Sequence, residues 1–122
     1  MNTRYSHFKS THDPRFLNIG VDEYYDNFWA EHAPFAYDKY SHAKGEWDIK
    51  MTKWGKNNKM KVYSMVPIEG VPFYTETTCD KTIALVERTP NKIIVEMDSI
   101  TREAPYGETL TCQEVWVAIS LP

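Results

Sequence analysis

Residues 46–66 read EWDIKMTKWGKNNKMKVYSMV, and this stretch decides the fold class. Every second side chain from residue 47 is apolar (Trp47, Ile49 and Met51), which predicts a half-buried strand. The sequence GKNN at 55–58 predicts a turn, because Gly and Asn are typical turn residues. A second run with strand character follows at 60–66, so the stretch predicts a β-hairpin.

Three further strands are predicted after this hairpin, at 73–87, 93–101 and 110–121. Residues 67–72, 89–92 and 104–107 are rich in Pro, Gly and Asn and predict the connections. Several of the strands have apolar residues on one face only. This pattern is typical of antiparallel neighbours joined by short turns.

Helices are predicted on the amino-terminal side of the hairpin. Apolar side chains at 21, 24, 25, 28 and 29 have the spacing of one helix face. Asn18 or Gly20 can cap this helix and Pro34 would end it, which predicts about thirteen residues. A short second helix is predicted at 35–42, a first strand at 15–19 is a candidate, and residues 1–15 are expected to be a flexible lead-in. The sequence therefore predicts an α+β domain with one or two helices packed on a curved antiparallel sheet.

Length and composition narrow the class of protein. The 122 residues allow one domain, and the net charge of −3 argues against a nucleic-acid binder. The chain has no apolar run of membrane-spanning length, and its start lacks the apolar region of a signal peptide, so a cytoplasmic location is expected. Cys79 and Cys112 are expected to be buried free thiols, with a disulfide between them as the alternative.

Catalytic signals are weak in this sequence. There is no GxSxG, HExxH or glycine-rich phosphate loop, so we predict no catalytic residue, no cofactor and no metal. His32 and His42, with Asp38 and Glu46 nearby, are better explained as solvated side chains than as a metal or acid–base group. A small enzyme remains an alternative, and its candidate acids would be Glu76, Glu96 and Asp98.

A basic segment surrounds one tryptophan. Five lysines lie between 50 and 61, with no acidic residue between Asp48 and Glu69. An exposed Trp with lysines suits an anionic membrane surface, so a docking site is predicted at Lys53, Trp54, Lys56 and Lys59. The alternative is that Trp54 belongs to the core and the lysines protect an edge strand.

Several ordered motifs resemble one family. They are GEWDI at 45–49 with TKW at 52–54, KMKVY at 59–63, TET at 75–77 and TREAPYGETL at 101–110. Together they resemble VASt domains, which are relatives of the StAR-related lipid-transfer (START) domains. The last motif is similar to the family pattern T-x-D-V-P-Y-G-D-x-F, with Glu103, Ala104, Glu108 and Leu110 as mild departures.

This resemblance implies a helix-grip fold with a lipid cavity between a curved sheet and a long C-terminal helix. It implies non-enzymatic binding and transfer of a sterol or similar apolar lipid, at the endoplasmic reticulum or membrane contact sites through neighbouring domains. The gripping helix is absent from the sequence given, so an open face, self-association or a protein-interaction role is an alternative.

Ile94 and Ile100 compete with Val95 and Met97 for the cavity face. The lipid-binding residues predicted are Tyr24, Phe28, Val62, Ile83, Val95, Val115 and Val117, with Pro105, Tyr106 and Gly107 at the rim.

Overall fold

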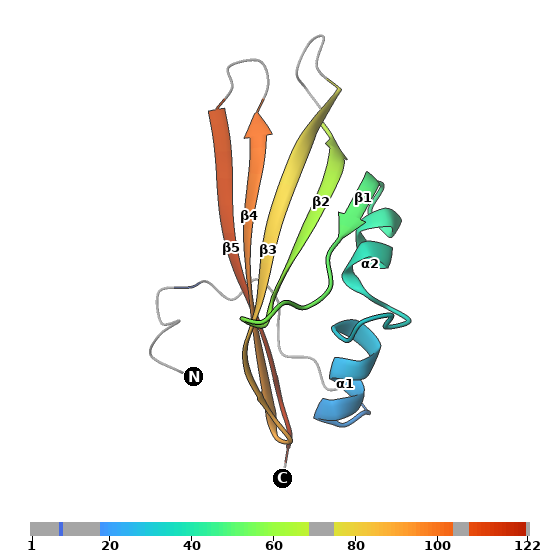
Figure 1. Ribbon diagram of the computed structural model, residues 1–122, viewed down its shortest axis with the longest axis vertical. Coiled ribbons are helices and arrows are strands. Elements are labelled where there is room, and N and C mark those ends of the chain that lie inside the picture. Colours follow the sequence, from blue (N-terminus) through green and yellow to red (C-terminus); the bar gives the residue numbers. More distant parts are fainter. Residues whose placement is uncertain (1–7, 9–17, 69–74, 104–107, 122) are drawn as a thin grey trace.

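The computed structural model describes residues 8, 18–68, 75–103 and 108–121. Two helices precede an antiparallel five-stranded sheet whose spatial order, β1-β2-β3-β4-β5, follows the sequence (Figure 1). This confirms the predicted α+β class with antiparallel strands. The elements are α1 (Val21–Phe28), α2 (Tyr37–Ala43), β1 (Trp47–Met51), β2 (Lys59–Pro67), β3 (Glu76–Thr89), β4 (Lys92–Glu103) and β5 (Glu108–Ile119).

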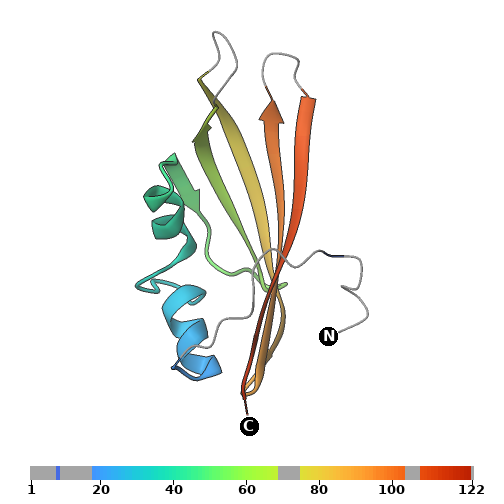
Figure 2. The same cartoon turned by 180° about the vertical axis from the view of Figure 1, so that it is seen from behind.

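The helices lie on one face of the sheet, here called the helix face. Figures 1 and 2 show both helices on the side of β1, while the upper halves of β4 and β5 have no helix against them. The core cluster lies between α1, α2 and the lower half of the sheet. Its fully buried members on the strands are Ile83, Ile93, Val95 and Met97.

Helix α1 is shorter than predicted. It ends at Phe28 because Trp29 leaves helical geometry, with a φ of −121°, well before Pro34. The backbone N–H of Phe35 then donates to the carbonyl of Asn27, which folds the chain back on itself. This turn buries Trp29, which is only 6% exposed. Helix α2 ends at Ala43. Two residues later Gly45 takes the left-handed conformation (φ 93°) that follows the end of many helices.

The hairpin predicted at 46–66 is confirmed, with one irregularity in its first strand. Trp47 pairs with Met65 and Lys50 pairs with Tyr63, so β1 carries one extra residue between them. Asp48 supplies it with a φ of 51°, a conformation that Asp tolerates better than most residues. The bulge moves Trp47 to the face opposite Met51, so the predicted alternation of 47, 49 and 51 on one face is wrong.

A second bulge, in β3, directs a cation towards α1. Leu85 pairs with Val95 and Glu87 pairs with Ile94, which leaves Val86 as the extra residue. Arg88 consequently lies on the helix face opposite Ile93, with its guanidinium 3.6 Å from the ring centroid of Tyr25. This cation–π contact joins the far end of the sheet to α1.

Some sequence-based predictions fall outside the described residues. They include the flexible lead-in at 1–15, apart from Phe8, and most of the candidate strand at 15–19. Pro105, Tyr106 and Gly107 also lie there. Among the described residues, none of the helices is long and apolar enough to cross a membrane.

Candidate functional site

The candidate site is the helix face of the sheet, and strand pairing settles which residues belong to it. Paired residues on antiparallel strands share a face, and Val62, Ile83 and Val95 all lie on the helix face. Val95 and Met97, rather than Ile94 and Ile100, therefore face the helices. Ile94 is buried on the face opposite the helices, which we call the convex face, and Ile100 is 47% exposed there.

Five predicted lipid-binding residues come together, but they fill the interior. Val62, Ile83 and Val95 are at most 2% exposed and pack against the half-buried Tyr24 and Phe28. The Tyr24 and Phe28 ring centroids lie 5.3 Å apart. These side chains form a packed core, so a ligand could reach them only by displacing their neighbours.

For β5, the sequence analysis predicted the wrong side chains to face the helices. Val95 pairs with Trp116, so Trp116 shares the helix face, and Val115 and Val117 lie on the convex face. We call the helix-face residues of this strand the β5 strip: Leu110, Cys112, Glu114, Trp116 and Ala118.

One end of the β5 strip contacts the core through Trp116, and the rest of the strip is exposed to solvent. The Trp116 ring meets the buried Trp29 edge-on, with centroids 6.3 Å apart, and Trp116 is still 36% exposed. Leu110 is 56% exposed, and Cys112 and Glu114 are exposed beside it. On the neighbouring strand, by contrast, Met97 and Ser99 are buried. The cover over the helix face therefore ends between β4 and β5.

Two surface hollows lie elsewhere, on the convex face. One, of about 270 Å³, lies along Thr82, Ala84 and Glu96, and the other, of about 410 Å³, lies along Lys50, Lys61 and Tyr63. Neither lies between the helices and the sheet. Of the residues predicted to line an apolar cavity, Val62 alone borders either of these two hollows.

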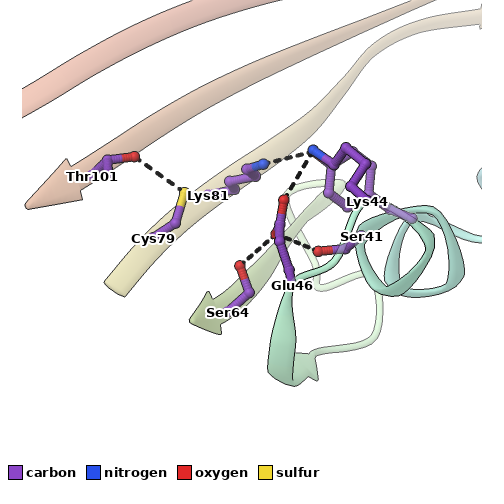
Figure 3. A network of polar contacts seen from close by, with 8 residues as sticks. Ser41, Lys44, Glu46, Ser64, Cys79, Lys81 and Thr101 are labelled. Atoms are coloured by element: carbon purple, nitrogen blue, oxygen red, sulfur yellow. Dashed lines mark hydrogen bonds and ion pairs between the residues drawn. The ribbon is translucent and has the colours of Figure 1, made fainter. Parts of the chain in front are cut away.

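A buried polar cluster joins α2 to the sheet at the upper edge of the core (Figure 3). The Glu46 carboxylate accepts hydrogen bonds from the hydroxyls of Ser41 and Ser64, at 2.5 and 2.8 Å. Its second oxygen lies 3.1 Å from the Lys44 ammonium. Burial alone would raise the pKa of Glu46, but these hydrogen bonds and the Lys44 charge outweigh burial and lower it.

Lys81 lies next to this cluster and was missed in the sequence analysis. It is 9% exposed, on the helix face of β3, and its Nζ donates to the Tyr37 hydroxyl at 2.7 Å. The sequence held a sign of this burial. Alternate residues of a strand share one face, and Lys81 lies between Cys79 and Ile83 in such a row, both of which are buried. A charged residue within an inward row is a sign of a functional or specific structural role.

The predicted docking residues are partly exposed. Lys53, Lys56 and Lys59 are exposed in and beside the β1–β2 connection. Trp54 is not the exposed anchor that was predicted, because it is half-buried against the core and its Nε1–H donates to the Trp29 carbonyl at 2.8 Å. This bond instead fixes the basic connection to the core.

The basic connection lies at a different level of the sheet from the strand end at Glu103. Lys59 pairs with Ala84, which pairs with Glu96, whereas the β4–β5 turn follows Glu103. Seven residues separate positions 96 and 103, or roughly 23 Å along a strand. The exposed lysines therefore lie far from the ends of β4 and β5 at Glu103 and Glu108.

The structure also places the three candidate acids and the two cysteines. Glu96 and Asp98 alternate with Met97 and Glu76 pairs with Pro67, so all three candidate acids lie on the convex face. Both cysteines are free, Cys79 buried and Cys112 exposed, so the prediction of two buried thiols is wrong for Cys112. Within the described ranges no group of three potential metal ligands occurs.

Comparisons with protein-family models, curated proteins and solved structures find no match to this chain.

Proposed function

We propose that the protein binds a sterol or similar lipid against the β5 strip and carries it between membranes without covalent chemistry. The proposal assumes a START-like helix-grip fold of the VASt type. It includes the cytoplasmic location at membrane contact sites that this resemblance implies.

One observation carries the proposal. On the helix face, the packed core lies beside β5, where the apolar side chains of Leu110 and Trp116 are 56% and 36% exposed. Apolar ligands bind such surfaces because contact removes apolar area from water, at roughly 25 cal/mol per Å². A ligand covering about 200 Å² of this surface would gain roughly 5 kcal/mol.

Leu110→Asp is expected to weaken binding of a fluorescent sterol at least tenfold, since it places a charge against the apolar ligand. Leu110 is exposed, so the fold should tolerate the change. Val117→Asp is the matched control, because Val117 is on the same strand, 47% exposed, on the convex face. Equal affinities of the two variants in a fluorescence titration would contradict the assignment.

Docking on anionic membranes is part of the proposal. It is supported by the exposure of Lys53, Lys56 and Lys59. Each lysine near an anionic surface contributes about 1 kcal/mol, so replacing all three by alanine should weaken vesicle binding roughly a hundredfold. The measurement is sedimentation with vesicles containing phosphatidylserine, and a triple arginine variant that keeps the charge is the control. Unchanged binding of the alanine variant would remove docking from the proposal.

A second candidate function is association of two copies through β5. It is favoured by the exposed apolar residues on the convex face of this last strand of the sheet, Val117 and Ile119, at 47% and 60%. Edge strands with apolar side chains readily pair with another strand. A lipid-loaded monomer and a lipid-free dimer differ in mass, so one measurement separates the two candidates.

A further inference from the structure

The buried Lys81 carries a charge that the described side chains do not neutralise directly. Among the described residues its ammonium contacts Tyr37, through the 2.7 Å hydrogen bond and a cation–π distance of 5.0 Å. No carboxylate of the described residues forms an ion pair with it. Burying an ammonium is costly unless it is paired, so this arrangement favours an anionic partner.

The charged side chains around Tyr37 also favour an anionic partner. Lys44 and Lys81 both lie near the Tyr37 ring, at 5.8 and 5.0 Å, whereas Glu46 is the one buried acid in the cluster. Glu46 is already engaged by two hydroxyls and by Lys44. Among the buried side chains and Lys44 there is thus one more positive charge than negative, before the exposed Glu114 is counted.

Glu114 is the acid that could compete for this charge. It lies on the β5 strip opposite Met97, and its charge contributes to the raised pKa of Tyr37. Glu114 is exposed to water and does not reach Lys81. It would repel an anion bound nearby, which provides an independent test.

The Tyr37 hydroxyl adds a second donor. Burial raises the pKa of Tyr37 to about 12, despite the lowering effect of the Lys44 ammonium, so the phenol stays protonated at neutral pH. Its oxygen accepts from Lys81, and the described contacts give its proton no acceptor. Lys81 and Tyr37 thus present N–H and O–H donors at one point.

Lys81 lies two strands from the β5 strip, with the buried Ser99 of β4 between them. Lys81 pairs with Ser99, which pairs with Cys112, so a single row crosses from the buried lysine to the exposed strip. In Figure 3, Lys81 extends from β3 towards the group formed by Lys44 and Glu46. A lipid lying along the strip would have to reach across Ser99 to place its head group at Lys81.

We propose that Lys81 and Tyr37 bind the oxyanion head group of an amphipathic lipid whose apolar part lies along the β5 strip. This inference rests on the proposed function and specifies its ligand as an anionic lipid. A carboxylate, sulfate or phosphate would accept from both donors and neutralise the excess charge, and charge-assisted hydrogen bonds of this kind are the strong ones.

The test compares cholesterol with cholesteryl sulfate, which share an apolar body and differ in the charged head. Binding of both, of oleate and of inorganic sulfate is measured on the whole chain by displacement of a fluorescent sterol and by calorimetry. The variants are Lys81→Met, which keeps the bulk of the side chain, Tyr37→Phe and Glu114→Gln. Lys61→Met is the matched control, since Lys61 is exposed on the convex face.

Cholesteryl sulfate and oleate are expected to bind at least tenfold more tightly than cholesterol. Lys81→Met should abolish this advantage, Tyr37→Phe should reduce it and Glu114→Gln should increase it. Lys61→Met should preserve it and leave cholesterol binding unchanged. Inorganic sulfate should bind far more weakly, since it has no apolar part.

Two results would overturn the inference and are distinguishable. Equal binding of cholesterol and cholesteryl sulfate, unaffected by Lys81→Met, would overturn the anionic site and leave lipid binding standing. No binding of either sterol or of oleate would overturn the inference together with the proposed function. Removing a buried charge is often neutral or stabilising, so Lys81→Met should fold; a thermal melt checks this.

Discussion

Ile83→Asp is expected to unfold the chain. Ile83 is fully buried at the centre of the core, opposite Met60 and Met97. A carboxylate there has no hydrogen-bonding partner and also removes apolar contacts, which should cost more than about 4 kcal/mol. Because domains of this size are stable by roughly 5–15 kcal/mol, the loss would remove most or all of the stability.

The measurement is circular dichroism during urea and thermal unfolding, with Val117→Asp as the control. Val117 is equally β-branched and apolar but 47% exposed on the convex face, so the control should stay within about 1 kcal/mol of wild type. If Val117→Asp unfolds the chain and Ile83→Asp does not, the assignment of the two sheet faces is reversed.

Glu46→Ala is expected to cost about 2–4 kcal/mol, although the residue belongs to no predicted site. Its carboxylate is the shared acceptor for Ser41 on α2 and Ser64 on β2, and it neutralises Lys44. Alanine leaves two buried hydroxyls without this acceptor. Glu46→Gln keeps an acceptor oxygen and should therefore cost less than alanine.

The pH dependence of stability tests the same cluster. The pKa of Glu46 is lower in the folded protein than its ordinary value of 4.5, so the folded state favours the ionised form. Its contribution to stability is complete above pH 4.5 and is lost as the pH falls through the folded pKa. Wild type should thus lose stability below pH 4.5 more steeply than Glu46→Gln in urea titrations.

Glu87→Gln serves as the control for this pH series. Its ion pair with Lys92 is long, at 3.7 Å, and both side chains are substantially exposed, so it should contribute little. A Glu46→Gln profile that parallels wild type would show that the cluster does not hold the ionised carboxylate.

Strand positions were predictable because the sheet leaves an alternating pattern in the sequence. The face of a strand was predictable only where one row was clearly more apolar. In β5 the row of Val115, Val117 and Ile119 is the more apolar one, yet pairing with β4 places it outside. Trp116 pairs with Val95 and therefore shares its face towards the helices. Only the register between β4 and β5 reveals this pairing.

Bulges and turns explain other differences. Asp48 inverts the face of Trp47, and the turn after Phe28 shortens α1 although Trp29 continues the apolar spacing. The cluster of Ser41, Lys44, Glu46 and Ser64, with Lys81 beside it, was not predictable as a unit. Its members come from α2, from the segment before β1 and from two strands, and no local pattern connects residues so far apart in sequence.

Native mass spectrometry of the freshly purified chain tests the central claim most directly, that the β5 strip holds a lipid. We expect a monomer carrying one lipid-sized adduct, and we expect Leu110→Asp to lose this adduct while Val117→Asp keeps it. A lipid-free dimer, or an adduct that persists in Leu110→Asp and is lost from Val117→Asp, would contradict the claim.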